Sequence, residues 1–179
     1  MKIVVCIKQV PDTAEVKLDP KTGTLIRDGV PSIINPDDKA AIEAALQLKD
    51  QYGAQVTVLS MGPAQAEKAL REALAMGADE AFLITDRAFG GSDTLATSTI
   101  IAAAIKKLGC DVVFCGRQAI DGDTAQVGPQ IAEKLGLPQI SYAADIQLDG
   151  KTVTVKRMLE DGYMTVKTQT PCLITCIKE

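Results

Sequence analysis

Short apolar segments alternate with helical patterns over residues 1–136, and this alternation restricts the chain to a small set of folds. The apolar segments have the length of buried strands and cover residues 3–7, 55–60, 81–84 and 111–115. The helical patterns cover residues 37–51, 64–76, 93–108 and 124–135. Because parallel strands need a crossover between them, this order predicts an α/β fold, a parallel sheet with helices on both faces.

Residues at the predicted helix ends support these boundaries. Asn35 suits the position before a helix and Pro36 suits the first helical position, where a missing N–H costs nothing. Three helices are followed by glycine, at Gly77, Gly109 and Gly136. The apolar stripes of the four helices should face the sheet, and we expect burial of Ile42, Leu70, Ile101 and Ile131.

Two regions depart from the alternation. Residues 12–31 contain a Pro-Lys-Thr-Gly turn between two alternating segments, which predicts a hairpin inserted between the first strand and the first helix. Residues 144–177 contain no helical pattern, and an Asp-Gly turn inside them predicts an antiparallel hairpin over 145–156, followed by further strands at 163–166 and 171–177. A chain of 179 residues buries one full core, so we expect a single domain over residues 1–179.

Composition argues against several classes of function. The net charge is −4 without a basic patch, and three tyrosines, three phenylalanines and no tryptophan offer little for base stacking, so no nucleic-acid partner is expected. The longest apolar runs are too short to cross a bilayer, which predicts no membrane insertion. The first residues resemble a short signal-peptide core, but Lys8 and the polar stretch after it favour a first strand, so we expect a cytoplasmic location.

Side-chain catalysis is also disfavoured. The chain has no histidine, which removes Ser-His-Asp and Cys-His catalysis, the usual zinc sites and the commonest general base. Its five cysteines include no C-x-x-C pair, and four of them lie in apolar strand-like runs, so they are expected to be buried small hydrophobic residues. No catalytic residue and no metal site emerges from the sequence.

The segment between the strand at 111–115 and the helix at 124–135 predicts a phosphate-binding loop. The first N–H groups of a helix lack internal partners and carry partial positive charge. Asp123 or Thr124 suits the N-cap, which would leave the N–H groups of residues 124–127 to hold phosphates. Small residues at Ala119 and Gly122 permit close approach to the backbone, and Arg117 can neutralise phosphate charge. The loop is neither a P-loop nor a G-x-G-x-x-G motif, so an ordinary capped strand–helix loop is an equal alternative.

A second polar helix start follows Gly90 and Gly91. Ser92 or Asp93 can cap the helix, and this common role is one interpretation of the segment. Thr94 and Thr97 lie on one face of the first turn, where their hydroxyl groups can meet a polar ligand chain such as a ribityl.

Five segments, in order, resemble the electron transfer flavoprotein β subunit. The loop Gly-Arg-Gln-Ala-Ile-Asp-Gly-Asp-Thr-Ala-Gln-Val-Gly at 116–128 is similar to that family's adenine-nucleotide loop. The other four are a first strand, an Asn-Pro helix start, an Ala-Met-Gly-Ala segment and a signature region, at 4–10, 34–45, 73–79 and 155–175. One departure is Met164, where an acid or amide is typical of the family.

The resemblance implies an adenine-nucleotide α-hydrolase-like sheet with nucleotide contacts at its carboxyl edge, where open α/β folds bind ligands. Carried over residue by residue, the contacts are Cys6, Asn35, Pro36, Asp37, Asp38, Met61, Asp93, Thr94, Thr97, Gly116, Arg117, Gln118, Ala119, Ile120, Asp121, Gly122, Asp123, Thr124, Ala125, Gln126 and Val127. Taken alone, the side chains of Cys6 and Met61 are more typical of core packing.

The resemblance also implies a cofactor, partners and a function. Thr94, Thr97 and Gly122 resemble the subgroup that binds FAD in this subunit, and AMP is the alternative. The chain would be an electron carrier and not itself an enzyme, paired with an FAD-containing α subunit and serving an acyl-CoA dehydrogenase-type partner. NADH-driven bifurcation is implied only with FAD. Family members continue past the position of Glu179 into a docking loop and an arm, so a truncated or fragmentary nucleotide-binding core is expected. The alternative function is a nucleotide-binding module of the universal-stress or ATP-pyrophosphatase type, without a redox role.

Overall fold

A computed structural model describes residues 1–12, 19–21 and 31–178 of the chain. The strands are β1 (Lys2–Ile7), β2 (Gln9–Pro11), β3 (Ser32–Ile34), β4 (Gln55–Met61), β5 (Glu80–Ile84), β6 (Val112–Gly116), β7 (Gln139–Asp149), β8 (Thr152–Leu159), β9 (Gly162–Gln169) and β10 (Cys172–Cys176). The helices are α1 (Pro36–Tyr52), α2 (Glu67–Met76), α3 (Thr94–Leu108) and α4 (Val127–Leu135), with 3-10 turns η1 (Ala64–Ala66) and η2 (Arg87–Phe89).

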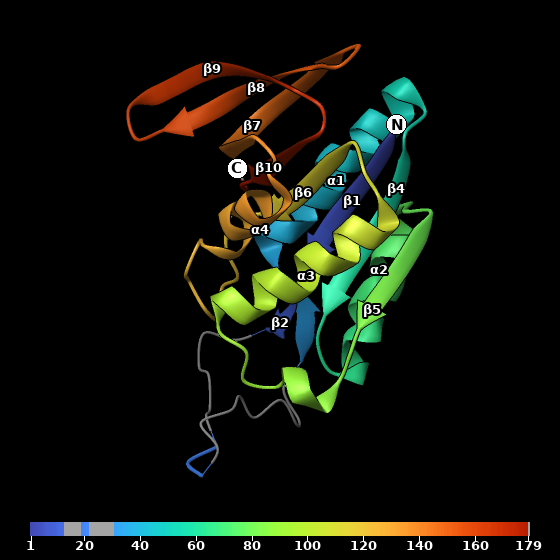
Figure 1. The fold of residues 1–179 in the computed structure, drawn as a ribbon, viewed down its shortest axis with the longest axis vertical. Coiled ribbons are helices and arrows are strands. Elements are labelled where there is room, and N and C mark those ends of the chain that lie inside the picture. The colour runs from blue at the N-terminus through green and yellow to red at the C-terminus, as the bar shows by residue number, and fades with distance from the viewer. Residues whose placement is uncertain (13–18, 22–30, 179) are drawn as a thin grey trace.

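The main sheet has eight strands in the order β5-β4-β1-β6-β10-β7-β8-β9 (Figure 1). Neighbouring strands from β5 to β7 are parallel, and β8 and β9 are added antiparallel. This arrangement confirms the predicted parallel sheet and C-terminal hairpin. The strand predicted from residue 145 begins earlier, at Gln139, because β7 changes partner: its first residues pair with β10, and the rest pair with β8.

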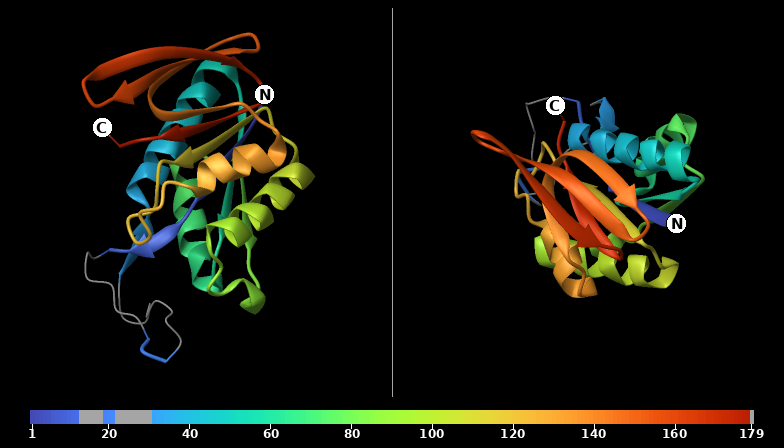
Figure 2. Two further views of the ribbon diagram at one scale, coloured as in Figure 1. Left: turned by 60° about the vertical axis from the view of Figure 1, so that its left-hand side comes forward. Right: turned by 90° about the horizontal axis from the view of Figure 1, so that it is seen from above.

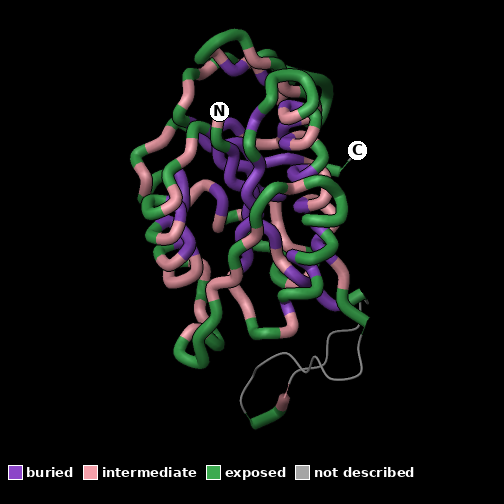
Figure 3. Tube along the Cα trace, turned by 90° about the vertical axis from the view of Figure 1, so that its right-hand side faces the viewer, coloured by how far each residue is buried: buried purple, intermediate pink, exposed green. Residues whose placement is uncertain are grey.

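Helices α1 and α2 cover one face of the parallel sheet, and α3 and α4 cover the other (Figure 2). One core cluster packs under α1 and α2 and includes Ile42 and Leu70, and the other packs under α3 and α4 and includes Ile101 and Ile131. All four residues are buried, which confirms the predicted apolar stripes. Buried residues follow the central strands and the inner faces of the helices (Figure 3).

Two predicted helix starts differ from the structure. The pattern at 64–76 divides into η1 and α2. Helix α4 begins at Val127 and not at Thr124, because Asp123 and Ala125 have φ values of 49° and 51°, outside the helical region. The residue before α4 is Gln126, which makes no capping hydrogen bond with its side chain, so the predicted N-cap at Asp123 or Thr124 is wrong.

The strands β2 and β3 form a separate antiparallel pair on either side of the predicted hairpin at 12–31. Most of that segment, 13–18 and 22–30, lies outside the described residues, so the hairpin stays a prediction. Within the described part of the chain, no helix is both long and apolar enough to span a bilayer.

Candidate functional site

Asp38 joins the ends of two central strands. It lies in the first turn of α1, and its carboxylate accepts hydrogen bonds from the backbone N–H of Lys8, after β1, at 2.7 Å and of Gly116, at the end of β6, at 3.0 Å. Burial raises the pKa of Asp38 to about 7, although these N–H donors favour the charged form. The side chain predicted to meet a ligand therefore holds the sheet's carboxyl edge together.

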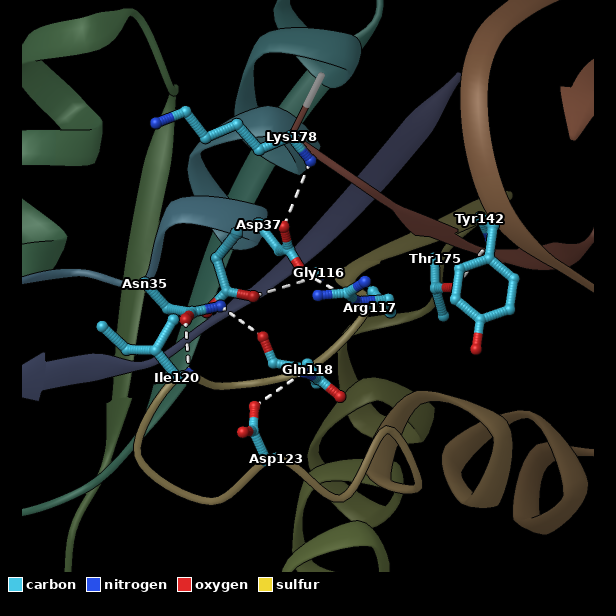
Figure 4. Close-up of polar contacts among 11 residues, drawn as sticks. Asn35, Asp37, Gly116, Arg117, Gln118, Ile120, Asp123, Tyr142, Thr175 and Lys178 are labelled. Atoms are coloured by element: carbon cyan, nitrogen blue, oxygen red, sulfur yellow. Dashed lines mark hydrogen bonds and ion pairs between the residues drawn. The ribbon is translucent and has the colours of Figure 1, made fainter. Parts of the chain in front are cut away.

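Asn35 fixes the loop that follows β6. The side chain of this buried residue donates from Nδ2 to the backbone oxygen of Gln118 at 2.8 Å and accepts from the N–H of Ile120 at 3.0 Å (Figure 4). Asn35 is the residue before α1, as predicted, with Pro36 at the first helical position, but its side chain makes no capping bond. Its polar atoms hold the loop against the helix start instead.

The two acids of the loop are paired within the protein. The Asp121 side chain is only 2% exposed, and its Oδ1 lies 2.6 Å from Lys8 Nζ. Asp123 accepts from Gln118 Nε2 at 2.6 Å. Neither carboxylate is directed at the start of α4, which removes the apparent conflict between two acids and an anion site.

A run of backbone N–H groups remains at the end of the loop. The N–H groups of Gly122 and Asp123 bond to the Ala119 carbonyl, at 3.2 and 2.9 Å. By contrast, the N–H groups of residues 124–127 make none of the hydrogen bonds found among the described residues. Their place before and at the first turn of α4 gives them the partial positive charge of a helix start. Gly122 is exposed, and a Cβ added there would meet no atom within 4 Å.

Arg117 is directed away from those N–H groups. Its Nε lies 3.3 Å from Asp37 Oδ2, and the other oxygen of Asp37 accepts from the backbone N–H of Lys178 at 3.1 Å (Figure 4). Arg117 also lines a pocket of about 310 Å³ beside β7, together with Ala125, Pro129, Tyr142, Arg157 and Thr175. Arg117 thus has an acidic partner within the protein, and its predicted phosphate contact stays a prediction.

The start of α3 lies against the start of α4. Of the two candidate caps, Asp93 accepts from the N–H of Ala96 at 2.8 Å, whereas the Ser92 hydroxyl donates to Phe89 O. Thr94 Oγ1 donates to Gln126 Oε1 at 3.1 Å, which links the predicted ribityl contact to the loop. Thr97 is half-buried one turn further along α3.

Cys6 and Met61, the two sulfur-bearing residues among the predicted contacts, pack in the core. Cys6 is buried opposite Cys115 in the β1–β6 register, and Met61 packs partly buried against the same cluster. A hydrogen bond with Cys6, together with burial, raises the pKa of the Cys115 thiol. Four of the five cysteines are buried, as predicted, and Cys110 is half-buried. Its raised pKa keeps the Cys115 thiol protonated, and a protonated thiol is a poor nucleophile.

The structure thus brings residues 35–38, the end of β1 and the loop 116–127 to one edge, with α3 on the far side of the loop. Sequence reasoning missed Lys8, Ser98 and Gln130, which hold the loop or Thr94 by hydrogen bonds. Lys8 carried a usable signal, because it follows the first strand directly. No group of three potential metal ligands occurs among residues 1–12, 19–21 and 31–178.

Comparisons with known proteins agree on one family. A family model described as electron transfer flavoprotein domain matches residues 22–179. The chain is 69% identical to the electron transfer flavoprotein subunit beta of Clostridium acetobutylicum, over all of this chain and 69% of that protein. It is 61% identical to the caffeyl-CoA reductase-Etf complex subunit CarD of Acetobacterium woodii, over all of this chain and 69% of that protein. It is 54% identical to protein FixA of Azorhizobium caulinodans, over 99% of this chain and 66% of that protein.

Proposed function

Because this chain belongs to the electron transfer flavoprotein family, among the β subunits, we propose that it binds an adenine nucleotide at the carboxyl edge of its sheet. It carries electrons as part of a complex with an α subunit that contains FAD. The chain supplies binding and orientation, whereas the flavin supplies the redox chemistry when it is bound. This function needs no acid, base or nucleophile among the side chains.

The observation that carries the proposal is the run of N–H groups at residues 124–127, which have no hydrogen-bond partner among the described residues. These groups precede a helix at the carboxyl edge of a parallel sheet, the usual place for a nucleotide phosphate. The loop is held before any ligand arrives, by Asn35 through its backbone and by Lys8 through Asp121. A site held in advance loses less entropy on binding.

The nucleotide we propose is FAD, with AMP as the alternative. Thr94 and Thr97 lie on the first turns of α3, beside the loop, where hydroxyl groups can reach the ribityl chain that AMP lacks. Exposed Gly122 leaves room for the diphosphate without a negative side chain. The adenine would meet the ends of β1 and β4, near Cys6 and Met61, through backbone atoms and apolar contacts.

The relatives suggest the partner's chemistry. One is named a subunit of a caffeyl-CoA reductase-Etf complex, and another is named acryloyl-CoA reductase electron transfer subunit gamma, from Anaerotignum propionicum. We infer an acyl-CoA dehydrogenase-type partner for this chain and, with FAD in place, NADH-driven bifurcation by the complex. These names favour a redox role over a nucleotide-binding module without one.

Nucleotide analysis of the complex tests the proposal. The chain is co-purified with its α subunit, the complex is denatured, and the released FAD and AMP are counted. Two FAD and no AMP per complex is the expected result. One FAD with one AMP per complex would mean that this chain is part of an electron carrier and binds AMP as a structural nucleotide. One FAD without a second nucleotide would overturn the proposed nucleotide site of this chain.

We also propose that residues 1–179 form one nucleotide-binding domain, since both core clusters lie against the same sheet. Limited proteolysis should leave the described core in one piece. Release of β7–β9 as a separate stable fragment would contradict a single domain. The cytoplasmic location stays a prediction from the sequence.

A further inference from the structure

Four polar side chains form a continuous line from the interior of α3 to the rim of the loop. Ser98 Oγ lies 2.9 Å from Gln130 Oε1, Gln130 Nε2 lies 3.2 Å from Thr94 Oγ1, and Thr94 Oγ1 lies 3.1 Å from Gln126 Oε1. Ser98 is fully buried, Gln130 and Thr94 are half-buried, and Gln126 is exposed. The line therefore begins in the core and ends where a ligand would lie.

The surroundings of Ser98 set the direction of these hydrogen bonds. Its hydroxyl has one proton and two acceptors within reach, Gln130 Oε1 and the carbonyl oxygen of Leu95 at 3.0 Å. The Leu95 oxygen already accepts the Thr99 hydroxyl at 2.7 Å and belongs to the hydrogen-bond ladder of α3. Because both lone pairs of the Leu95 oxygen are occupied, the Ser98 hydroxyl donates its proton to Gln130 Oε1.

The rest of the line follows from that first bond. With its oxygen accepting from Ser98, Gln130 presents its amide nitrogen to Thr94, so Thr94 accepts there and donates its own proton to Gln126 Oε1. Thr94 Oγ1 then keeps one lone pair, and Gln126 keeps the two N–H groups of Nε2. An acceptor and a donor thus lie side by side at the rim.

We propose that Thr94 and Gln126 form a recognition pair for a hydroxyl group of the ligand, and that Ser98 and Gln130 are positioning residues that set its polarity. An alcohol donates one hydrogen bond and accepts others, so it satisfies both members of the pair, whereas a phosphate oxygen only accepts and gains nothing from the Thr94 lone pair. The inference rests on the proposed function and names the ribityl chain of FAD as the ligand group.

A purely structural role explains the line less well. Helices α3 and α4 already pack through Ile101 and Ile131 in a shared apolar cluster. Burying an amide and a hydroxyl between them costs desolvation that their hydrogen bonds roughly offset. Apolar side chains would hold the helices together at least as well. The polar line is therefore better explained by the acceptor on Thr94 and the donor on Gln126 at its exposed end.

Two substitutions at Gln130 test the inference in the complex with the α subunit. Gln130→Met removes the line and keeps the side chain's length. Gln130→Glu keeps the size of the side chain, but a carboxylate only accepts hydrogen bonds. The Thr94 hydroxyl then donates to residue 130. The Gln126 side-chain amide must rotate so that its nitrogen, and not its oxygen, faces Thr94. Both should weaken FAD by about tenfold, the effect of one lost or mismatched hydrogen bond in a partly buried site. For Gln130→Met, AMP affinity should stay within about twofold, since AMP has no ribityl chain. The Gln130→Glu variant also places a negative charge near the proposed phosphates, so its AMP affinity should fall as well, and by less than its FAD affinity.

The controls separate recognition from folding. Gln47→Met and Gln47→Glu repeat the two substitutions at an exposed position of α1, where the Gln47 side chain donates to Glu43 Oε1. Both variants should leave the FAD and AMP affinities unchanged. Ser98→Ala frees the Gln130 amide to turn and should give a smaller FAD loss, with melting temperature recorded for every variant.

The outcomes distinguish the two proposals. Wild type that binds FAD, with a Gln130→Glu variant that binds it equally well, would overturn the inference and leave the proposed function intact. Equal losses of FAD and AMP in the uncharged Gln130→Met variant would show a structural role and also overturn it. Wild type that takes AMP and never FAD would overturn the inference and leave the proposed adenine-nucleotide site with its alternative ligand, AMP.

Discussion

The Asp38 carboxylate lies directly against Gly116, whose backbone N–H donates to Asp38 Oδ1 at 3.0 Å. A Cβ added at Gly116 would overlap that oxygen and lie 2.7 Å from the backbone nitrogen of Asp38 and 2.8 Å from the carbonyl carbon of Asp37. The start of α1 and the end of β6 are therefore in contact at a position that accepts only glycine.

Substitution of Gly116 by alanine should destabilise the fold. The added methyl group meets backbone atoms that cannot move without shifting α1, so we expect a loss of about 1–3 kcal/mol or more in the free energy of unfolding. Urea denaturation measures the change. Gly122→Ala is the matched control, because its Cβ meets no atom within 4 Å and should cost little. Equal stability of the two variants would contradict the close contact.

Asp38 should make stability fall as the pH rises from its ordinary pKa of 3.8 to about 7, its pKa in the folded protein. Its pKa is raised to about 7 in the folded protein by burial, from an ordinary value of 3.8, so between these values the folded state holds a proton that the unfolded state has lost. Folding is thus favoured at low pH, and this contribution is lost as the pH rises through the folded pKa.

The comparison that isolates this effect uses Asp38→Asn, whose side chain does not titrate. The wild type should be favoured over the variant most at pH 4–5 and least at pH 8, measured as unfolding free energy in urea. A wild-type advantage that grew with pH would show that the carboxylate is charged throughout, with the N–H donors of Lys8 and Gly116 outweighing burial.

Replacing Gly122 with aspartate should weaken nucleotide binding without harming the fold. The side chain has open space, but it places a negative charge beside the proposed phosphates. We expect affinity to fall on the order of tenfold or more, measured by nucleotide titration of the complex. Gly122→Asn has the same shape without the charge, and a similar loss for both variants would rule out the electrostatic explanation.

Asn35→Ala should release the loop from α1. It leaves the N–H of Ile120 and the carbonyl of Gln118 without their partner, at a cost of about 1–3 kcal/mol for each group that water cannot reach. Amide exchange at Ile120 should quicken markedly. Asn35→Asp keeps the acceptor and should protect Ile120 partly, so exchange as fast as in Asn35→Ala would contradict the assigned geometry.

Thr97→Val should distinguish the two candidate nucleotides. It removes a hydroxyl and preserves the shape of the side chain, so a ribityl contact predicts weaker FAD binding, by up to about tenfold, with AMP nearly unchanged. Titration of both nucleotides against the same complex measures the difference. Parallel losses would mean that Thr97 supports the helix and not the ligand.

The sequence was sufficient for the elements and their inner faces, because both follow from local periodicity. Ile42 and Ile131 could be assigned to the core from spacing alone, and both are buried. The start of α4 could not be predicted in the same way. The positive φ values of Asp123 and Ala125 occur in a loop that is held by the pairing of Asp121 with Lys8, a contact that forms only in the folded chain.

The roles of individual polar residues were also beyond the sequence. Asp37 and Asp38 are adjacent and chemically alike, yet one pairs with Arg117 and the other joins two strand ends. Asn35 resembles an ordinary helix cap, and only the tertiary structure directs its side chain to the loop. The FAD site assembled from these residues stays a prediction.

The position of β10 has a consequence for how the chain is made. This strand lies between β6 and β7, yet the ribosome synthesises it after β7, β8 and β9. Until Cys172–Cys176 emerges, the nascent chain carries two unpaired strand edges, which are templates for wrong pairing with other chains. A message interrupted just before residue 172 would leave β6 and β7 without the strand that pairs with both of them.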